Sequence, residues 1–261
     1  MRNHIKPRKR GISIPISTII IVGAFIPVIV ATAIFSINMF EAQLQNSEFA
    51  YAENFMVTLA QVIEDVASQP NSTSYLKLNL RRGRLNVGSE RISIDISFGN
   101  VRYQSQSIYL EYVGGSLCGT LDRVLRGVNE TIISVDETAP LGVVYEKQYN
   151  GARILLNFAR LRIIKLADYY YLEDLDNYTT IYEIHYIDLQ YGGSTPGIGP
   201  IYIKVKNMGG FIGSVTDTSN ITITAQIGSV IYGITFPKAQ NVKYVTVRLV
   251  VTKVGIFFMG G

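Results

Sequence analysis

The feature that most constrains this chain is a stretch of 29 residues, Ile12 to Phe40, without a charged side chain. As an α-helix with a rise of about 1.5 Å per residue, it is long enough to cross the ~30 Å hydrocarbon core of a bilayer. Basic residues before an apolar run hold that end in the cytoplasm. Five of them precede it: Arg2, Lys6, Arg8, Lys9 and Arg10. We therefore expect the chain after this stretch to lie outside the cell.

Three interpretations of this N-terminus compete. The first is a secretory signal peptide cut after Ala33, because Ala31-Thr32-Ala33 has small residues in the right places. The apolar run is, however, longer than the roughly 7–15 residues of such a signal, and it continues past that site. The second is an uncleaved membrane anchor. The third is a leader that is removed before the apolar helix.

The third interpretation rests on Lys9, Arg10 and Gly11, which are followed directly by Ile12 and the apolar run. This arrangement resembles the class III signal peptide of archaeal pilins and archaellins. The resemblance implies that residues 1–11 are a leader, cut after Gly11 by a prepilin peptidase, and that the helix stays on the mature chain. It also implies that the helix is held in the cytoplasmic membrane before assembly. The resemblance further implies that the helix then packs against identical or related subunits in an extracellular filament.

The helical pattern continues beyond the uncharged stretch. Apolar side chains recur at spacings of three, four and seven, as in an amphipathic helix: Phe40, Leu44, Tyr51, Phe55, Leu59, Val62 and Val66. Polar residues, Glu48 and Glu64 among them, occupy much of the remaining surface. Pro70 and the polar run Asn71 to Ser74 end the pattern. We predict one helix from about residue 14 to 68, within an N-terminal region of residues 12–70.

Residues 71–261 show a period of two, which is typical of strands with one buried face. Expected strands cover 75–80, 92–98, 101–113, 142–146, 152–166, 180–190, 200–207, 220–227, 230–236 and 242–258. For residues 153–166 a helix is the other interpretation, and residues 117–127 are a weak helix candidate. The predicted fold is α+β: a long N-terminal helix followed by a mainly antiparallel, immunoglobulin-like β-sandwich. We expect residues 71–261 to fold alone.

The overall pI of about 9.0 does not indicate a nucleic-acid-binding protein. Without residues 1–11, 19 Lys and Arg side chains face 20 Asp and Glu side chains. Arg81, Arg82 and Arg84 form a local basic cluster, which we interpret as a solvated turn. Cys118 is the single cysteine, so no intrachain disulfide forms.

Four Asn-x-Ser/Thr sequons lie in the region that we expect outside the cell, at Asn71, Asn129, Asn177 and Asn220. Each lies near a predicted turn, where a glycan is accommodated most easily. They are candidate N-glycosylation sites.

No pattern indicates an enzyme. His185 is the one histidine after the leader, and no Gly-x-Ser-x-Gly, phosphate-loop or His-Glu-x-x-His motif occurs. The acidic stretch 168–178 lacks the spacing of known calcium loops. We therefore expect no catalytic residue, no cofactor and no metal site.

These observations predict a structural subunit, major or minor, of an archaeal type IV pilus-like filament. The alternative is a membrane-anchored or pseudopilus-assembled extracellular protein that binds a sugar or a peptide. A groove lined by aromatic side chains would favour that alternative.

Overall fold

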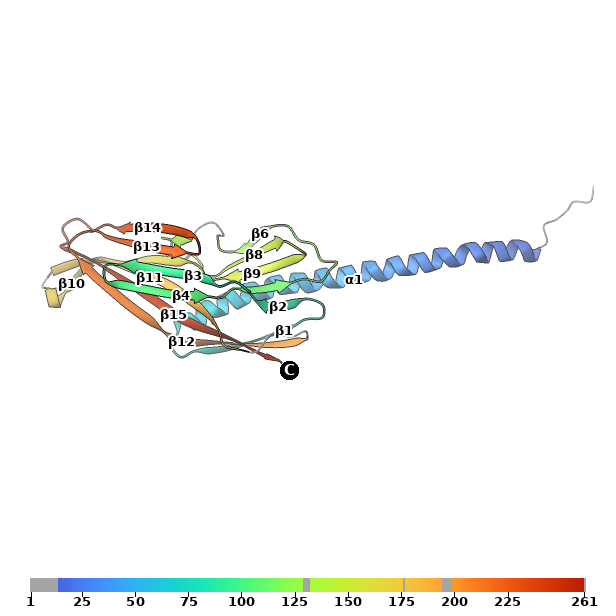
Figure 1. The fold of residues 1–261 in the computed structure, drawn as a ribbon, viewed down its shortest axis with the longest axis horizontal. Coiled ribbons are helices and arrows are strands. Elements are labelled where there is room, and N and C mark those ends of the chain that lie inside the picture. The colour runs from blue at the N-terminus through green and yellow to red at the C-terminus, as the bar shows by residue number, and fades with distance from the viewer. Residues whose placement is uncertain (1–13, 129–131, 176, 194–198, 261) are drawn as a thin grey trace, which may run out of the picture. The chain divides into compact units, whose positions relative to one another are not determined.

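The computed structural model describes residues 14–128, 132–175, 177–193 and 199–260. The chain divides into two compact units, Met1–Leu44 and Gln45–Gly261. One α-helix, α1 (Ile14–Ser68), contributes residues to both units (Figure 1). Its bounds agree with the helix predicted from about residue 14 to 68.

The end of α1 is fixed by the residues that follow it. Pro70 cannot continue a helix, and Asn71 adopts a positive φ of 60°. The hydroxyl of Ser72 lies 2.8 Å from the carbonyl oxygens of both Val66 and Gln69, and it donates to this pair. These contacts satisfy carbonyl groups that have no partner within the helix.

The β strands form three sheets (Figure 1). The six-stranded sheet has the order β1 (Thr73–Asn79), β12 (Pro200–Asp217), β15 (Tyr244–Gly260), β11 (Asn177–Tyr191), β10 (Leu161–Leu172) and β7 (Ile133–Ser134). The four-stranded sheet has the order β14 (Val230–Phe236), β13 (Ile221–Ile227), β3 (Ile92–Phe98) and β4 (Val101–Ser107). The five-stranded sheet has the order β2 (Arg84–Val87), β5 (Leu110–Val113), β9 (Ala152–Asn157), β8 (Val143–Gln148) and β6 (Arg123–Arg126).

Most neighbouring strands are antiparallel; β11 with β15 and β10 with β7 are parallel. A short 3₁₀ helix, η1 (Glu173–Leu175), lies between β10 and β11. The predicted fold class, a long apolar helix followed by a mainly antiparallel β unit, is confirmed.

Two local predictions need correction. The helix proposed for residues 117–127 is wrong, because the backbone amides of Leu117 and Thr120 donate to the side-chain oxygens of Gln45 and Gln148, and β6 follows. Residues 153–166 contribute to strands, as predicted, and not to a helix, but they do not form one strand. The chain breaks after Asn157, and β9 and β10 lie in different sheets.

The unit Gln45–Gly261 has two hydrophobic cores, which use opposite faces of the six-stranded sheet. Strand β15 contributes to both. Its residues Val245, Val247, Leu249 and Val251 belong to the core shared with the four-stranded sheet. Its residues Val254, Ile256 and Phe258 belong to the core shared with α1 and the five-stranded sheet. The pairing of β15 with β11 is uninterrupted, so these odd and even positions point to opposite faces.

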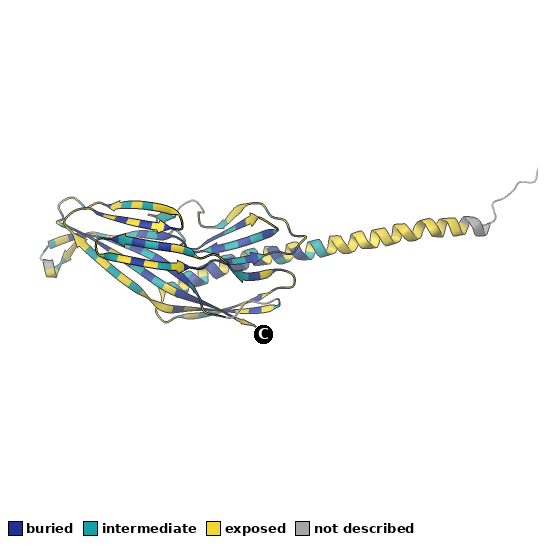
Figure 2. Cartoon of the chain, viewed as in Figure 1, coloured by how far each residue is buried: buried dark blue, intermediate teal, exposed yellow. Residues whose placement is uncertain are grey.

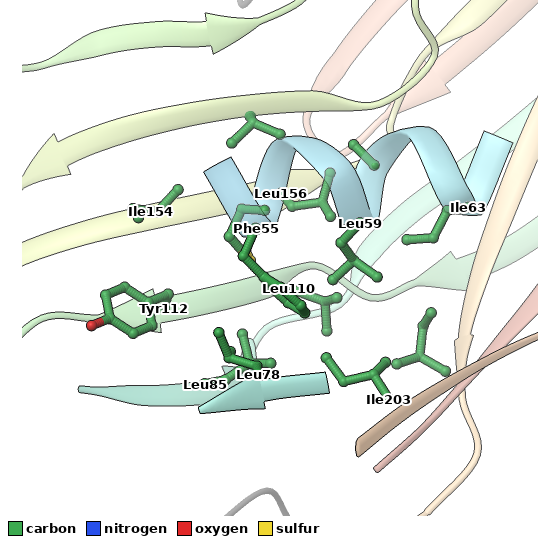
Figure 3. Packing of buried hydrophobic residues seen from close by; sticks show 14 of the residues in the cluster. Phe55, Leu59, Ile63, Leu78, Leu85, Leu110, Tyr112, Ile154, Leu156 and Ile203 are labelled. Atoms are coloured by element: carbon green, nitrogen blue, oxygen red, sulfur yellow. The ribbon is translucent and has the colours of Figure 1, made fainter. Parts of the chain in front are cut away.

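Figure 3 shows the core that contains α1. Phe55, Leu59 and Ile63 of the helix pack among residues of the five-stranded sheet, such as Leu110 and Leu156, and residues of the six-stranded sheet, such as Leu78 and Ile203. Burying a leucine completely contributes roughly 1.5–3 kcal/mol, and Leu59 has no exposed surface. The compact β unit therefore begins inside the helix, at Gln45, rather than at residue 71.

Candidate membrane and assembly segment

Residues 18–40 of α1 are exposed on every side. Its large apolar side chains are uncovered, with Ile19 71% and Phe35 69% exposed (Figure 2). An apolar helix without a polar face normally lies in lipid or inside a helical assembly. By length and composition, this helix is able to cross a membrane, and no residue of its most apolar window is buried in the chain. We call residues 18–40 the apolar segment.

A hydroxyl inside the apolar segment is satisfied without a partner chain. The hydroxyl of Thr32 donates to the carbonyl oxygen of Val28 at 2.8 Å, one helical turn earlier. This back-bond reduces the cost of placing a polar group in an apolar environment. The segment is therefore compatible with both lipid and a packed helical bundle.

The second part of α1 is bound into the β unit by its carboxylates as well as by its apolar side chains. Glu48 accepts hydrogen bonds from the backbone amides of Arg81 and Gly83, at 3.1 and 2.9 Å. Glu64 accepts one from the amide of Gly142 at 2.8 Å and pairs with Arg126 at 2.9 Å. Sequence periodicity placed both glutamates on the polar surface of the helix, but they attach the helix to the sheets.

Glu53 belongs to a further cluster at the same junction. Arg123 lies 3.0 Å from Glu53 and 3.0 Å from Glu146, which is buried. Burial raises the pKa of Glu53, and the hydrogen bond and charge of Glu146 act in the same direction. The guanidinium of Arg123 holds the two carboxylates together, so residues of the helix and of β6 and β8 are connected at one point.

The leader residues Lys9, Arg10, Gly11 and Ile12 lie outside the described residues, as does the sequon residue Asn129. Their proposed roles stay predictions from the sequence.

The other three sequons differ in accessibility. Asn71 and Asn220 are exposed and lie outside the strands. The side-chain oxygen of Asn220 accepts a hydrogen bond from the amide of Lys238 at 3.1 Å, so its nitrogen, the atom that carries a glycan, is not used in that bond. Asn177 is half-buried, and Thr179 of the same sequon is fully buried. Accessibility therefore favours modification at Asn71 and Asn220.

Among the described residues, no group of three or more His, Cys, Asp or Glu side chains is placed to hold a metal ion. His185 lies on β11, where its Nε2 is 3.0 Å from a carboxylate oxygen of Glu183. Burial lowers the pKa of His185, although the charge of Glu183 opposes this shift. We interpret His185 as a structural residue of β11 that contacts Glu183.

Four surface cavities of the β unit contain few aromatic residues. One lies on β3, β4 and β13 and is lined mainly by Ser, Asp and Gln side chains; the other three contain Tyr145, Tyr186 and Tyr191, one each. None of these four has the aromatic lining that a sugar-binding groove would be expected to show.

No family model, curated protein or solved structure matches this chain.

Proposed function

We propose that this chain is a structural subunit, major or minor, of an extracellular filament of the archaeal type IV pilus kind. Cleavage after Gly11 leaves Ile12 as the first residue. The apolar segment holds the subunit in the cytoplasmic membrane and then forms the filament core, while the β unit lies outside.

One observation carries this proposal: a single helix is uncharged and exposed over residues 18–40 and then becomes part of a folded core from Phe49 onward. Exposed apolar surface is unfavourable in water by about 25 cal/mol per Å². Lipid or copies of the same helix must therefore cover the segment. Anchoring the same helix in the β unit gives each subunit one helical element for assembly and one folded head.

The physical setting changes between the two stages. In lipid, helices associate by packing and not by a hydrophobic force between them. In a filament surrounded by water, burial of the segment contributes on the order of tens of kcal/mol per subunit before entropic losses. The filament should therefore resist dissociation without detergent.

A charge inside the apolar segment tests this role, because a buried unpaired charge costs several kcal/mol in every subunit. Ile20→Asp and Val30→Asp should give processed, exported protein that forms no filaments when surface material is viewed by negative-stain microscopy. Asn46→Asp is the matched control, since Asn46 is an exposed position of α1 outside the segment. It should leave filaments intact. Normal filaments from both segment variants would favour the membrane-anchored binding protein instead.

A further inference from the structure

A group of basic side chains lies at one end of the β unit. Lys77 is exposed on β1, Arg81 and Arg82 are exposed in the turn after it, and Arg84 is exposed at the start of β2. Lys204 lies beside β1 on β12, opposite Tyr75. We call these five basic residues the basic end. Glu48 contacts the turn through the backbone amides of Arg81 and Arg82.

Tyrosines are interleaved with these cations. The ammonium group of Lys77 lies 5.4 Å from the ring centre of Tyr202, and that of Lys204 lies 5.9 Å from the ring centre of Tyr75. Both rings are exposed. The alternate residues of the same strands, Leu78 and Ile203, are buried in the core, so the surface is held by a packed sheet. Tyrosine and long basic side chains are the residues enriched where proteins meet lipid headgroups.

The basic end lies close to the point where the chain enters the β unit. That unit begins at Gln45, and Glu48, less than one helical turn later, binds the turn that carries Arg81 and Arg82. Glu41, the first charged residue after the apolar segment, is four residues before Gln45, or about 6 Å along a helix. Whatever the angle between the two units, this short connection keeps the lipid around the apolar segment within reach of the basic end. The connection therefore raises the effective concentration of lipid headgroups at the basic end.

We propose that the basic end binds anionic lipid headgroups of the membrane that holds the subunit before assembly. The proposal rests on the membrane stage of the proposed function. Each basic side chain near an anionic surface strengthens attachment by about fivefold, and the tyrosines add contacts at the headgroup level. The arginine cluster, which the sequence indicated only as a solvated turn, then has a role at the headgroup surface. Release of these contacts accompanies transfer of the subunit into the filament.

The test uses the full-length chain reconstituted in vesicles. A fluorophore is attached to the thiol introduced by Asn79→Cys, next to the basic end; the native thiol of Cys118 is buried. Quenching by a headgroup-labelled lipid is compared in vesicles that contain phosphatidylglycerol and in vesicles of phosphatidylcholine alone. We expect quenching to be at least about twofold stronger in the anionic vesicles, and high salt should remove the difference.

Lys77→Glu combined with Arg81→Glu should reduce quenching in anionic vesicles to the level in phosphatidylcholine. Lys238→Glu combined with Lys243→Glu is the matched control. It makes the same charge change near Tyr244, at the start of β15. The opposite end of that strand, at Gly260, is the end that pairs with Ile201 of β12. This control should leave quenching unchanged, and circular dichroism should show that both variants are folded.

Equal quenching in the two lipid mixtures, or full quenching in the Lys77/Arg81 variant, would overturn the inference while leaving the filament proposal intact. Failure of the wild-type chain to insert into either vesicle would instead remove the membrane stage on which both proposals depend. Loss of quenching in the Lys238/Lys243 control as well would show a response to net charge and would also overturn the assignment to the basic end.

Discussion

The side-chain nitrogen of Asn207 lies 3.1 Å from the carbonyl oxygen of Val66, in the last turn of α1. The same nitrogen lies 3.0 Å from the carbonyl oxygen of Gln69. Asn207 is buried on β12 where the pairing with β15 shifts in register, and its side-chain oxygen accepts a hydrogen bond from the amide of Gly209 at 2.9 Å. Asn207, at an irregularity of the six-stranded sheet, thus caps the helix that carries the apolar segment.

Replacing Asn207 with Ala should lower the free energy of unfolding of the β unit by about 1–3 kcal/mol, because the carbonyl groups of Val66 and Gln69 lose one of their donors and the amide of Gly209 loses its acceptor. Thermal unfolding in detergent, followed by circular dichroism at a strand-sensitive wavelength, measures this change. Asn79→Ala is the control at an exposed position of β1 and should shift the midpoint little. Equal shifts for the two variants would mean that the cap contributes nothing specific.

A fragment of residues 45–261 should fold cooperatively, whereas residues 71–261 should not. The shorter fragment lacks Phe49, Phe55, Leu59 and Ile63, and each missing side chain leaves a cavity that costs about 2–5 kcal/mol. Dispersion of amide signals in a two-dimensional NMR spectrum distinguishes a packed fold from a collapsed chain. A well-dispersed spectrum from residues 71–261 would show that the helix is dispensable for the core.

The stability of the processed chain should fall as the pH is lowered from about 7 to below about 6. Burial lowers the pKa of His185 below its usual 6.5, the charge of Arg162 acts in the same direction, and Glu183 opposes this only in part. At a pH between the pKa of His185 in the folded chain and its pKa in the unfolded chain, the unfolded chain binds the proton more tightly. The stability contributed by neutral His185 is therefore present above the unfolded pKa and lost as the pH falls toward the folded pKa.

Urea unfolding at a series of pH values measures this dependence. His185→Gln should flatten the curve in that range, because the other histidine of the chain, His4, lies in the proposed leader. An unchanged slope would assign the dependence to other groups.

Intact mass of the surface protein should show glycans at Asn71 and Asn220. Asn71→Gln and Asn220→Gln should each reduce the mass by one glycan, whereas Asn177→Gln should change it only by the substitution, because that sequon is partly buried. A glycan at Asn177 in the folded protein would show that this strand end opens before or during modification.

Much of this fold follows from local sequence patterns. Pro70 and the polar residues after it define the end of α1, and alternation identifies strands such as β3 and β13. Long-range arrangement does not follow from such patterns. Parallel pairing of β11 with β15 joins segments far apart in the chain. The break at Phe158 exists because β9 belongs to the five-stranded sheet and β10 to the six-stranded sheet.

The carboxylates of α1 illustrate the same limit for the site. Spacing identifies Glu48 and Glu64 as members of a polar face, but their partners, the turn at Arg81 and the amide of Gly142, come from distant segments. The apolar segment is different, because lack of charge over a length sufficient to cross a bilayer is a property of the sequence alone. The place of Arg81 beside Glu48, by contrast, emerges only when the chain folds.

The central claim is that the mature helix begins at Ile12 and remains part of an assembled filament. The most direct measurement is N-terminal sequencing and intact mass of this chain in filaments sheared from cells and purified. We predict that the filament contains the chain with Ile12 as its first residue and Ile34 within it. A mature start at Ile34, in soluble protein without filaments, would contradict the account and identify a secreted protein that discards its apolar helix.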